Sequence, residues 1–591
     1  MTRGAKLALA AVMSLSVMAQ AQPKVGLLEI KGSPKARPAE LSWLMGSSEP
    51  TLREIVDAIE AAAADEAVGP IVIRLKDASL TSAQVEEIGA AIRKVQGAGK
   101  KVNVFSEGYG PAELLLGSYA DKVLIQKGGP VSLPGLFMEE MYLADTLNWI
   151  GVKADLVQVG DYKGANEMFV NNAPSKAWEQ NINQLLDSLY GEMRERLKVG
   201  RKLSDAKLDD AMKSAWMADD EEAMNAGLVD SGIDLPGLGE AVTGRPNAKI
   251  QKLAAGEESS LALGTGNPMT EMMAMMRMLS EKPRHKATMP TIAVLHIDGT
   301  IIDGDSSGGG MFGDGGSVGS RTIRNAIEDI RSQDLIKGVV VRIDSPGGSA
   351  TASEVIWQGL RRLSETKPVW VSVGSMAASG GYYIAVGGDR IYVNPSSIVG
   401  SIGVVGGKLS MGGLYDMAKV KTVGRGRGPR ADMFDSTKAW SPEQLAMVRD
   451  KMKRTFDLFT RRVAEGRQGI DLSKTAGGWL FAGKRAIELK MADKIGGLDL
   501  AISDLASDRG LTEYAVMDYP APRSLPEVLE DAFKGFGVRA PGASGQNHLV
   551  MGLRELVGER AWPSVRSALS GLMLLRDQPV VLVMPRAIIV R

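Results

Sequence analysis

Short apolar runs alternate with amphipathic stretches along most of the chain, most clearly between positions 288 and 400. The apolar runs are rich in β-branched residues and end at polar or glycine-containing turns, a pattern that predicts strands. The stretches between them repeat their apolar residues at helical spacing, and Thr351 with Glu354 predicts a capping box in one of them. The predicted strands span 291–297, 338–343, 368–373 and 390–393, and the predicted helices span 320–331 and 350–365. This alternation predicts parallel βαβ units.

The first half of the chain carries the same pattern, so the sequence contains an internal repeat. Arg74 aligns with Arg342 and Asp121 with Asp389, and both pairs are 268 residues apart (342 − 74 and 389 − 121). A shared offset of this kind indicates a duplicated domain. We therefore predict an α/β protein with two tandem domains of one fold. The predicted organisation is a leader at 1–21, a first domain at 24–240, a linker at 241–290, a second domain at 288–515 and a C-terminal extension at 516–591.

Composition restricts the chemistry that the chain can perform. Lys plus Arg and Asp plus Glu both number 70, so the formal net charge is +0 and no nucleic-acid partner is indicated. There is no cysteine, which excludes disulfides and thiolate chemistry. Only three histidines are present, His285, His296 and His548, and no metal-ligand spacing or cofactor motif is found. Lysine is therefore a serious candidate for the general base of any hydrolase built on this sequence.

The N-terminal residues predict export from the cytoplasm. A basic start precedes the apolar run Leu7–Met18, and Ala19, Gln20 and Ala21 form an A-x-A cleavage site. The alternative is an uncleaved anchor that holds the protein at the membrane. Both place the body of the protein outside the cytoplasm, in the periplasm or at the periplasmic face of the inner membrane.

Three further segments have a distinctive composition. The linker carries six methionines in ten residues at 269–278, which predicts a packing helix or an oligomer contact. The glycine-rich stretch 303–320 lacks a Walker lysine and is interpreted as a flexible loop. The late apolar stretch Pro579–Val590 is interpreted as strands, because Pro585 and Arg586 interrupt it.

Ser379 is the candidate nucleophile, because its neighbours are small and it follows a predicted strand. The stretch AASGG would let a substrate backbone come close, and GGYYIAV predicts a helix that begins beside the serine. The N–H group of Gly380 is one candidate oxyanion donor. Gly347 and Gly348, in the loop DSPGGS, are candidates for a second donor. The alternative is that these small residues only allow a helix to pack closely against a strand.

The internal repeat favours the catalytic interpretation. At the offset of 268 residues, Ser379 aligns with Pro111, and the two loop glycines align with Ser79 and Leu80. Proline suits the first position of a helix, but it has neither a hydroxyl nor an N–H group. The first half therefore keeps the framework without the candidate site, which indicates that the site is functional rather than structural.

The motifs DSPGGSATASE, SMAASGGYYIA and GSIGV together resemble the signal peptide peptidase SppA family in its long, tandem form. The resemblance covers roughly residues 24–515 and implies the ClpP/crotonase-like fold and a serine endopeptidase. It implies that Lys163, in GDYKGANEMF, is the general base and that Ser401, in GSIGV, orients this lysine. It also implies that the substrates are cleaved signal peptides and other short or unfolded hydrophobic chains, and that the protein forms homo-oligomers, tetramers in the long form.

The two repeats are complementary at this predicted site. The second half has VGRGRGPRADMF (423–434) where the first has the lysine motif, so one copy carries the lysine and the other the serine. This asymmetry predicts one active site that straddles both domains. To act as a base Lys163 must be neutral, and burial without a carboxylate partner would lower its pKa from about 10.4. We therefore expect Asp161 and Glu167 to point away from the lysine.

Two other functions remain open from the sequence. The crotonase-like fold also serves acyl-CoA hydratases and isomerases, which use paired oxyanion N–H groups. A catalytically silent scaffold of the same fold is the third alternative. The histidines compete poorly as bases, because His296 lies within an apolar strand, His285 in the linker and His548 in the tail.

Overall fold

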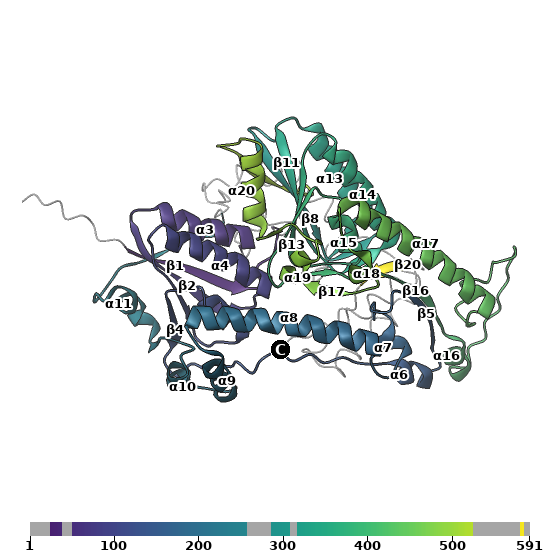
Figure 1. Ribbon diagram of the computed structural model, residues 1–591, viewed down its shortest axis with the longest axis horizontal. Helices are drawn as coiled ribbons and strands as arrows, with labels where there is room; N and C mark the ends of the chain where they lie inside the picture. Colours follow the sequence, from purple (N-terminus) through teal and green to yellow (C-terminus); the bar gives the residue numbers. More distant parts are fainter. Residues whose placement is uncertain (1–23, 38–49, 257–284, 308–315, 524–579, 584–591) are drawn as a thin grey trace, which may run out of the picture.

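The computed structural model describes residues 24–37, 50–256, 285–307, 316–523 and 580–583 (Figure 1). The predicted leader, the methionine-rich stretch 269–278 and His548 lie outside these residues. Among the described helices, none is both long and apolar enough to cross a bilayer.

The first half is built on a parallel sheet with the strand order β6-β4-β3-β2-β1-β7. Helices α3 and α4 pack together on this sheet, and each begins with a capping box, Thr51 with Glu54 and Thr81 with Gln84. The strands are β1 (Lys24–Gly32), β2 (Val68–Ala78), β3 (Val102–Ser106), β4 (Lys122–Gln126), β6 (Ser231–Ile233) and β7 (Ile250–Lys252). The helices are α3 (Leu52–Ala64), α4 (Ser82–Gly97), α5 (Pro111–Gly117), α6 (Ala144–Trp149), α7 (Glu167–Val170), α8 (Lys176–Arg201), α9 (Asp205–Ser214), α10 (Asp220–Asn225), η1 (Leu235–Gly237) and α11 (Leu238–Thr243).

The second half repeats this plan with the strand order β17-β15-β13-β11-β8-β19, and β14 lies beside β13. Within this sheet only β17 runs antiparallel to its neighbour. The strands are β8 (Thr291–Asp298), β11 (Ile336–Ser345), β13 (Val369–Ala378), β14 (Arg390–Val393), β15 (Ile398–Gly400), β17 (Leu480–Ala482), β18 (Lys494–Ile495) and β19 (Ala515–Tyr519). The helices are α13 (Ser320–Ser332), α14 (Ala350–Ser364), α15 (Gly380–Ala385), α16 (Gly412–Met417), α17 (Pro442–Gly466), α18 (Leu472–Thr475), α19 (Gly483–Glu488) and α20 (Leu498–Asp508).

The internal repeat is visible in the element boundaries. Helices α3 and α13 begin at 52 and 320, and α4 and α14 begin at 82 and 350, so both pairs differ by 268 residues. All four strands and both helices predicted for 291–393 are present. The sheets also reach beyond the predicted domain ends, because β7 pairs with β1 and β19 pairs with β8.

One local prediction from the sequence is wrong. The first residue to cap α14 is Ser349, whose side chain accepts the Ala352 N–H, so Thr351 already lies inside the helix. Glu354 does not reach back to a cap; its carboxylate instead accepts hydrogen bonds from Arg462 and Tyr383. The nearer hydroxyl wins because Ser349 has the extended backbone that a cap residue needs.

A third, mixed sheet joins the two halves. Its strand order is β10-β9-β12-β20-β16-β5, and β5 (Lys153–Val159) comes from the first half. The other members are β9 (Thr300–Ile302), β10 (Ser317–Gly319), β12 (Gly347–Ser349), β16 (Val404–Ser410) and β20 (Val580–Val583). Helix α8 runs from the first sheet along the underside of the second half towards α7 (Figure 1). Each half therefore contributes elements to the other.

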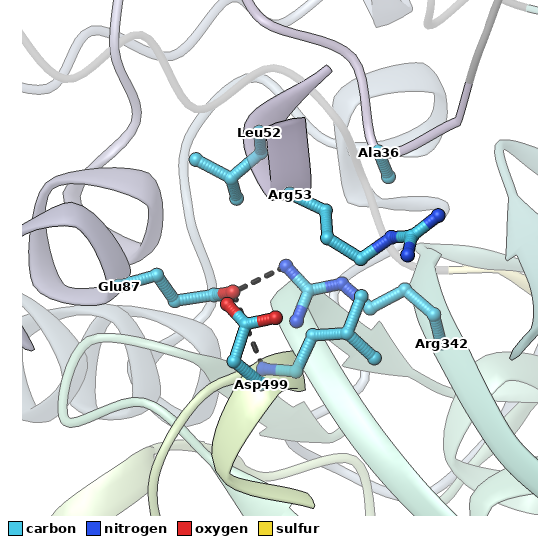
Figure 2. A pocket seen from close by; sticks show the side chains of 7 residues that line it. Ala36, Leu52, Arg53, Glu87, Arg342 and Asp499 are labelled. Atoms are coloured by element: carbon cyan, nitrogen blue, oxygen red, sulfur yellow. Dashed lines mark hydrogen bonds and ion pairs between the residues drawn. The ribbon is translucent and has the colours of Figure 1, made fainter. Parts of the chain in front are cut away.

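A polar cluster lies at a second junction of the halves, in a small pocket (Figure 2). Glu87 on α4 and Arg342 on β11 form an ion pair with an N–O distance of 2.7 Å. Their side chains are only 3% and 4% exposed. Burial, together with the neighbouring Glu87 carboxylate, raises the pKa of Asp499 to about 7. The pocket is lined by Ala36, Leu52, Arg53, Glu87, Arg342, Leu498 and Asp499.

Candidate active site

Lys163 and Ser379 meet where the two halves join, although they are 216 residues apart in the sequence. The Nζ atom of Lys163 lies 2.6 Å from the Oγ atom of Ser379, and both side chains are 0% exposed. Strands β5 and β16 produce this contact. Val159, the last residue of β5, pairs with Val404, the first residue of β16. This register brings the loop after β5, which holds Lys163, against the loop before β16, which holds Ser401.

Ser379 occupies a tight turn between β13 and α15. Its backbone angles, φ 55° and ψ −113°, are unusual for a residue other than glycine. The turn is held by the Ser379 N–H, which donates to Gly400 O at 2.8 Å, and by the Tyr383 N–H, which donates to Ser379 O at 2.8 Å. Backbone strain that the surroundings enforce in this way clusters at functional sites. The sharp strand–turn–helix connection presents the hydroxyl to Lys163.

The surroundings of Lys163 suit a neutral amine. Besides the Ser379 hydroxyl, its Nζ atom contacts the carbonyl and the hydroxyl of Ser401, both at 2.9 Å. A neutral amine has two N–H donors and one lone pair, which three such contacts satisfy when Ser379 donates its proton. Burial lowers the pKa of Lys163 well below its ordinary value of 10.5. Burial is the sole cause of this shift, with no opposing contribution from a carboxylate.

The two acidic residues near Lys163 in sequence point elsewhere, as expected. Asp161 is exposed to solvent. Glu167 accepts hydrogen bonds from the N–H and the hydroxyl of Ser175 at 2.7 and 2.6 Å. Among the described residues, no ion pair to Lys163 is formed. The charge of the lysine is therefore not stabilised by either neighbour.

The glycines predicted as oxyanion donors lie together beside Ser379. A methyl group on Gly380 would stand 3.1 Å from the backbone nitrogen of Gly348 and 3.2 Å from Gly347 Cα, so the two backbones approach closely. Gly347 has a φ of +102°, a conformation that favours glycine. Its N–H group donates to Ser345 Oγ at 3.1 Å. Gly348 is therefore better placed than Gly347 to pair with Gly380.

Asn181 is a site residue that the sequence analysis missed. It is 0% exposed on α8, and its amide donates to Tyr162 O at 2.8 Å and to Gly478 O at 3.2 Å. Its Oδ1 atom accepts the Leu480 N–H at 2.9 Å. The Tyr162 ring, next to the lysine, also stacks on Trp479 with a centroid distance of 3.7 Å. One first-half side chain thus fixes both the lysine loop and the segment leading into β17.

Replacing Asn181 with aspartate is expected to lower kcat by about 10²-fold with little change in KM, because the lysine loop loses two of its fixing hydrogen bonds. The new carboxylate also favours the charged lysine, so the acid limb of the pH–rate profile should move to higher pH. The matched control is Asn183→Asp, an exposed position on the same helix. A variant with normal kcat and an unmoved pH profile would show that Asn181 has no positioning role.

The counterpart of Lys163 in the second half lies elsewhere than the sequence indicated. Strands β5 and β16 begin at 153 and 404, a difference of 251 residues, so Lys163 corresponds to Leu414 in α16. The stretch 423–434 lies further on, in an exposed connection. The second copy still has no lysine at this place, so the predicted complementarity of the two halves is retained.

The two described histidines lie at the opposite edge of the second sheet from β15. His296 Nε2 lies 2.8 Å from Asp518 Oδ1, and His285 Nε2 lies 2.8 Å from Asp518 O. Asp518 belongs to β19, the strand at that edge. Their hydrogen bonds therefore serve the attachment of β19 rather than Ser379.

Comparisons with known proteins agree with this site. The profile of Peptidase family S49 matches the chain twice, over residues 94–235 and 361–512. Protease 4 of Salmonella typhi is 28% identical over 510 residues, covering 84% of this chain and 79% of that protein. Protease 4 of Haemophilus influenzae is 28% identical over 470 residues, covering 76% of this chain and 72% of that protein.

A shorter relative matches one half of the chain. A putative protease of Synechocystis is 32% identical over 185 residues, covering 31% of this chain and 67% of that protein. The double profile match confirms the prediction of two tandem α/β domains of the ClpP/crotonase-like fold. The chain belongs to Peptidase family S49, as a protease of the tandem, SppA-type form.

Proposed function

We propose that this protein is a serine endopeptidase in which Ser379 is the nucleophile and Lys163 the general base. The observation that carries the proposal is the 2.6 Å contact between Lys163 Nζ and Ser379 Oγ. Burial and the absence of an ion pair among the described residues favour the neutral amine that a base requires. Ser401 supports the assignment by accepting both N–H groups of that amine.

The reaction begins when the Ser379 hydroxyl transfers its proton to Lys163 Nζ and its oxygen attacks the peptide carbonyl carbon. The N–H groups of Gly380 and Gly348 stabilise the oxyanion that forms. The C–N bond then breaks, and Lys163 gives its proton to the departing amine. In the second half of the cycle, water attacks the acyl ester as Lys163 accepts its proton, and that proton returns to Ser379 when the acid leaves.

The substrates in this proposal are cleaved signal peptides and other short or unfolded hydrophobic chains, acted on outside the cytoplasm. The SppA-type relationship and the export signal predicted at 1–21 support this assignment. A homo-oligomer, and the tetramer that the resemblance implied, remain predictions, as does association with the membrane.

An acyl-CoA enzyme and a silent scaffold are the competing functions, and one labelling experiment separates them from the protease. A fluorophosphonate probe is expected to modify Ser379, as peptide mapping by mass spectrometry would show, and CoA is expected not to bind in a titration. Ser379→Ala should abolish labelling, whereas Ser375→Ala, a hydroxyl near the end of the same strand, should retain it. Undiminished labelling or peptide cleavage by pure Ser379→Ala protein would refute the assigned nucleophile.

A further inference from the structure

The C-terminal strand β20 lies inside the mixed sheet, between two strands of the active site. It runs antiparallel to β12, with Gly347 opposite Val583, Gly348 opposite Leu582 and Ser349 opposite Val581. On its other side it runs antiparallel to β16, with Val405 opposite Val581 and Gly406 opposite Val580. In Figure 1 it is the yellow strand beside β16.

The two neighbours of β20 carry the catalytic machinery of the proposed function. Strand β12 contains the glycines beside Gly380, and β16 begins three residues after Ser401. In the described sheet, β12 pairs on its other side with β9, and β16 pairs on its other side with β5. Without β20, the facing edges of β12 and β16 would lack their main-chain partner. The gap between them is one strand wide and opens onto the catalytic serine.

An extended peptide satisfies such a gap by main-chain hydrogen bonding on both sides. The residues of β20 are VVLV, an uncharged aliphatic stretch of the class assigned above to substrates. Because these residues belong to the same chain as the site, they reach it at a high effective concentration, of order millimolar for a flexible tether. An incoming substrate must therefore displace them.

We propose that the gap between β12 and β16 is the peptide-binding site of the protease, and that residues Val580–Val583 occupy it as a tethered competitor of substrate. The ligand class is an extended, aliphatic peptide that pairs antiparallel with both strands. The inference rests on the proposed function for the word substrate, but the occupancy of the gap rests on strand pairing alone.

A binding experiment tests occupancy without using catalysis. Ser379→Ala protein is prepared at full length and ending at Pro579, and a fluorescein-labelled peptide of sequence PVVLV is titrated into each and followed by anisotropy. The truncated protein should bind the peptide roughly tenfold or more tightly, because the competing strand is gone. Equal affinities in the two proteins would overturn the proposal. This readout is unaffected if Ser379 proves not to be the nucleophile.

A kinetic experiment tests competition in the active enzyme without truncation. Val581→Pro removes a main-chain donor from β20 and should lower KM for a peptide substrate while kcat stays unchanged. Val590→Pro, outside the paired residues, is the matched control and should leave KM as it is. A KM that does not change in Val581→Pro would contradict the proposal. Specific activity that rises on dilution would contradict occupancy by the same chain, since a tether acts independently of protein concentration.

Discussion

Lys163→Met is expected to lower kcat/KM for peptide hydrolysis by about 10²–10⁴-fold, the range that a positioned general base contributes. Methionine fills a similar volume in the buried site but cannot accept the Ser379 proton. The free energy of unfolding should not fall, because the variant removes an amine that burial already disfavours in its charged form. Steady-state kinetics and urea unfolding of the same preparation measure the two effects.

Lys408 provides the matched control for this prediction. It lies on β16, and burial lowers its pKa as well, but its Nζ atom donates to Asp435 O at 2.7 Å rather than to the site. Lys408→Met should therefore keep kcat/KM near the wild-type value. Loss of activity in both variants, or retention of activity in Lys163→Met, would contradict the assignment of Lys163 as base.

Glu87→Ala is expected to destabilise the protein by about 3–5 kcal/mol, the usual effect of removing one partner from a buried ion pair. Arg342 would be left charged and 4% exposed at the junction of the halves (Figure 2). Glu87 also accepts hydrogen bonds from Asn394 Nδ2 at 2.9 Å and from the Leu498 N–H at 3.3 Å. These bonds tie α4 of the first half to the second half. Urea unfolding, followed by far-UV circular dichroism, measures the change.

The internal repeat supplies the control for the buried pair. Arg74 is the counterpart of Arg342 and bonds to Glu107, whose side chain is 45% exposed. Glu107→Ala should change the free energy of unfolding by no more than about 1 kcal/mol, because water screens exposed pairs. The double variant Glu87→Leu/Arg342→Met should recover most of the stability lost in Glu87→Ala. Equal effects of Glu87→Ala and Glu107→Ala would show that burial of the pair is unimportant.

The sequence predicted the elements whose signals are local. Apolar runs such as 291–297 became strands, and the small residues around Ser379 predicted the strand–turn–helix connection that the structure contains. The cap of α14 was assigned to Thr351 instead of Ser349, because two hydroxyls two residues apart compete and spacing alone does not choose between them.

Features that depend on pairing between distant segments could not be read from the sequence. The 251-residue offset that relates Lys163 to Leu414 follows from the register of β5 and β16, which no local pattern encodes. The apolar stretch after Pro579 predicted strands, but not that β12 and β16 would be their partners. Asn181 did leave a signal, a polar residue among Trp178, Ile182 and Leu185 on the apolar face of α8. Its partners in the other half were not predictable.

The central claim is that one active site, assembled from both halves, uses a neutral Lys163 to activate Ser379. The pH dependence of the rate at which a fluorophosphonate modifies Ser379 tests it most directly. A base whose folded-state pKa is lowered works above that pKa and fails as the pH falls through it. We predict one ionisation well below 10.5, absent in Lys163→Met. An ionisation near 10.5, or the same pH profile in Lys163→Met, would contradict the claim.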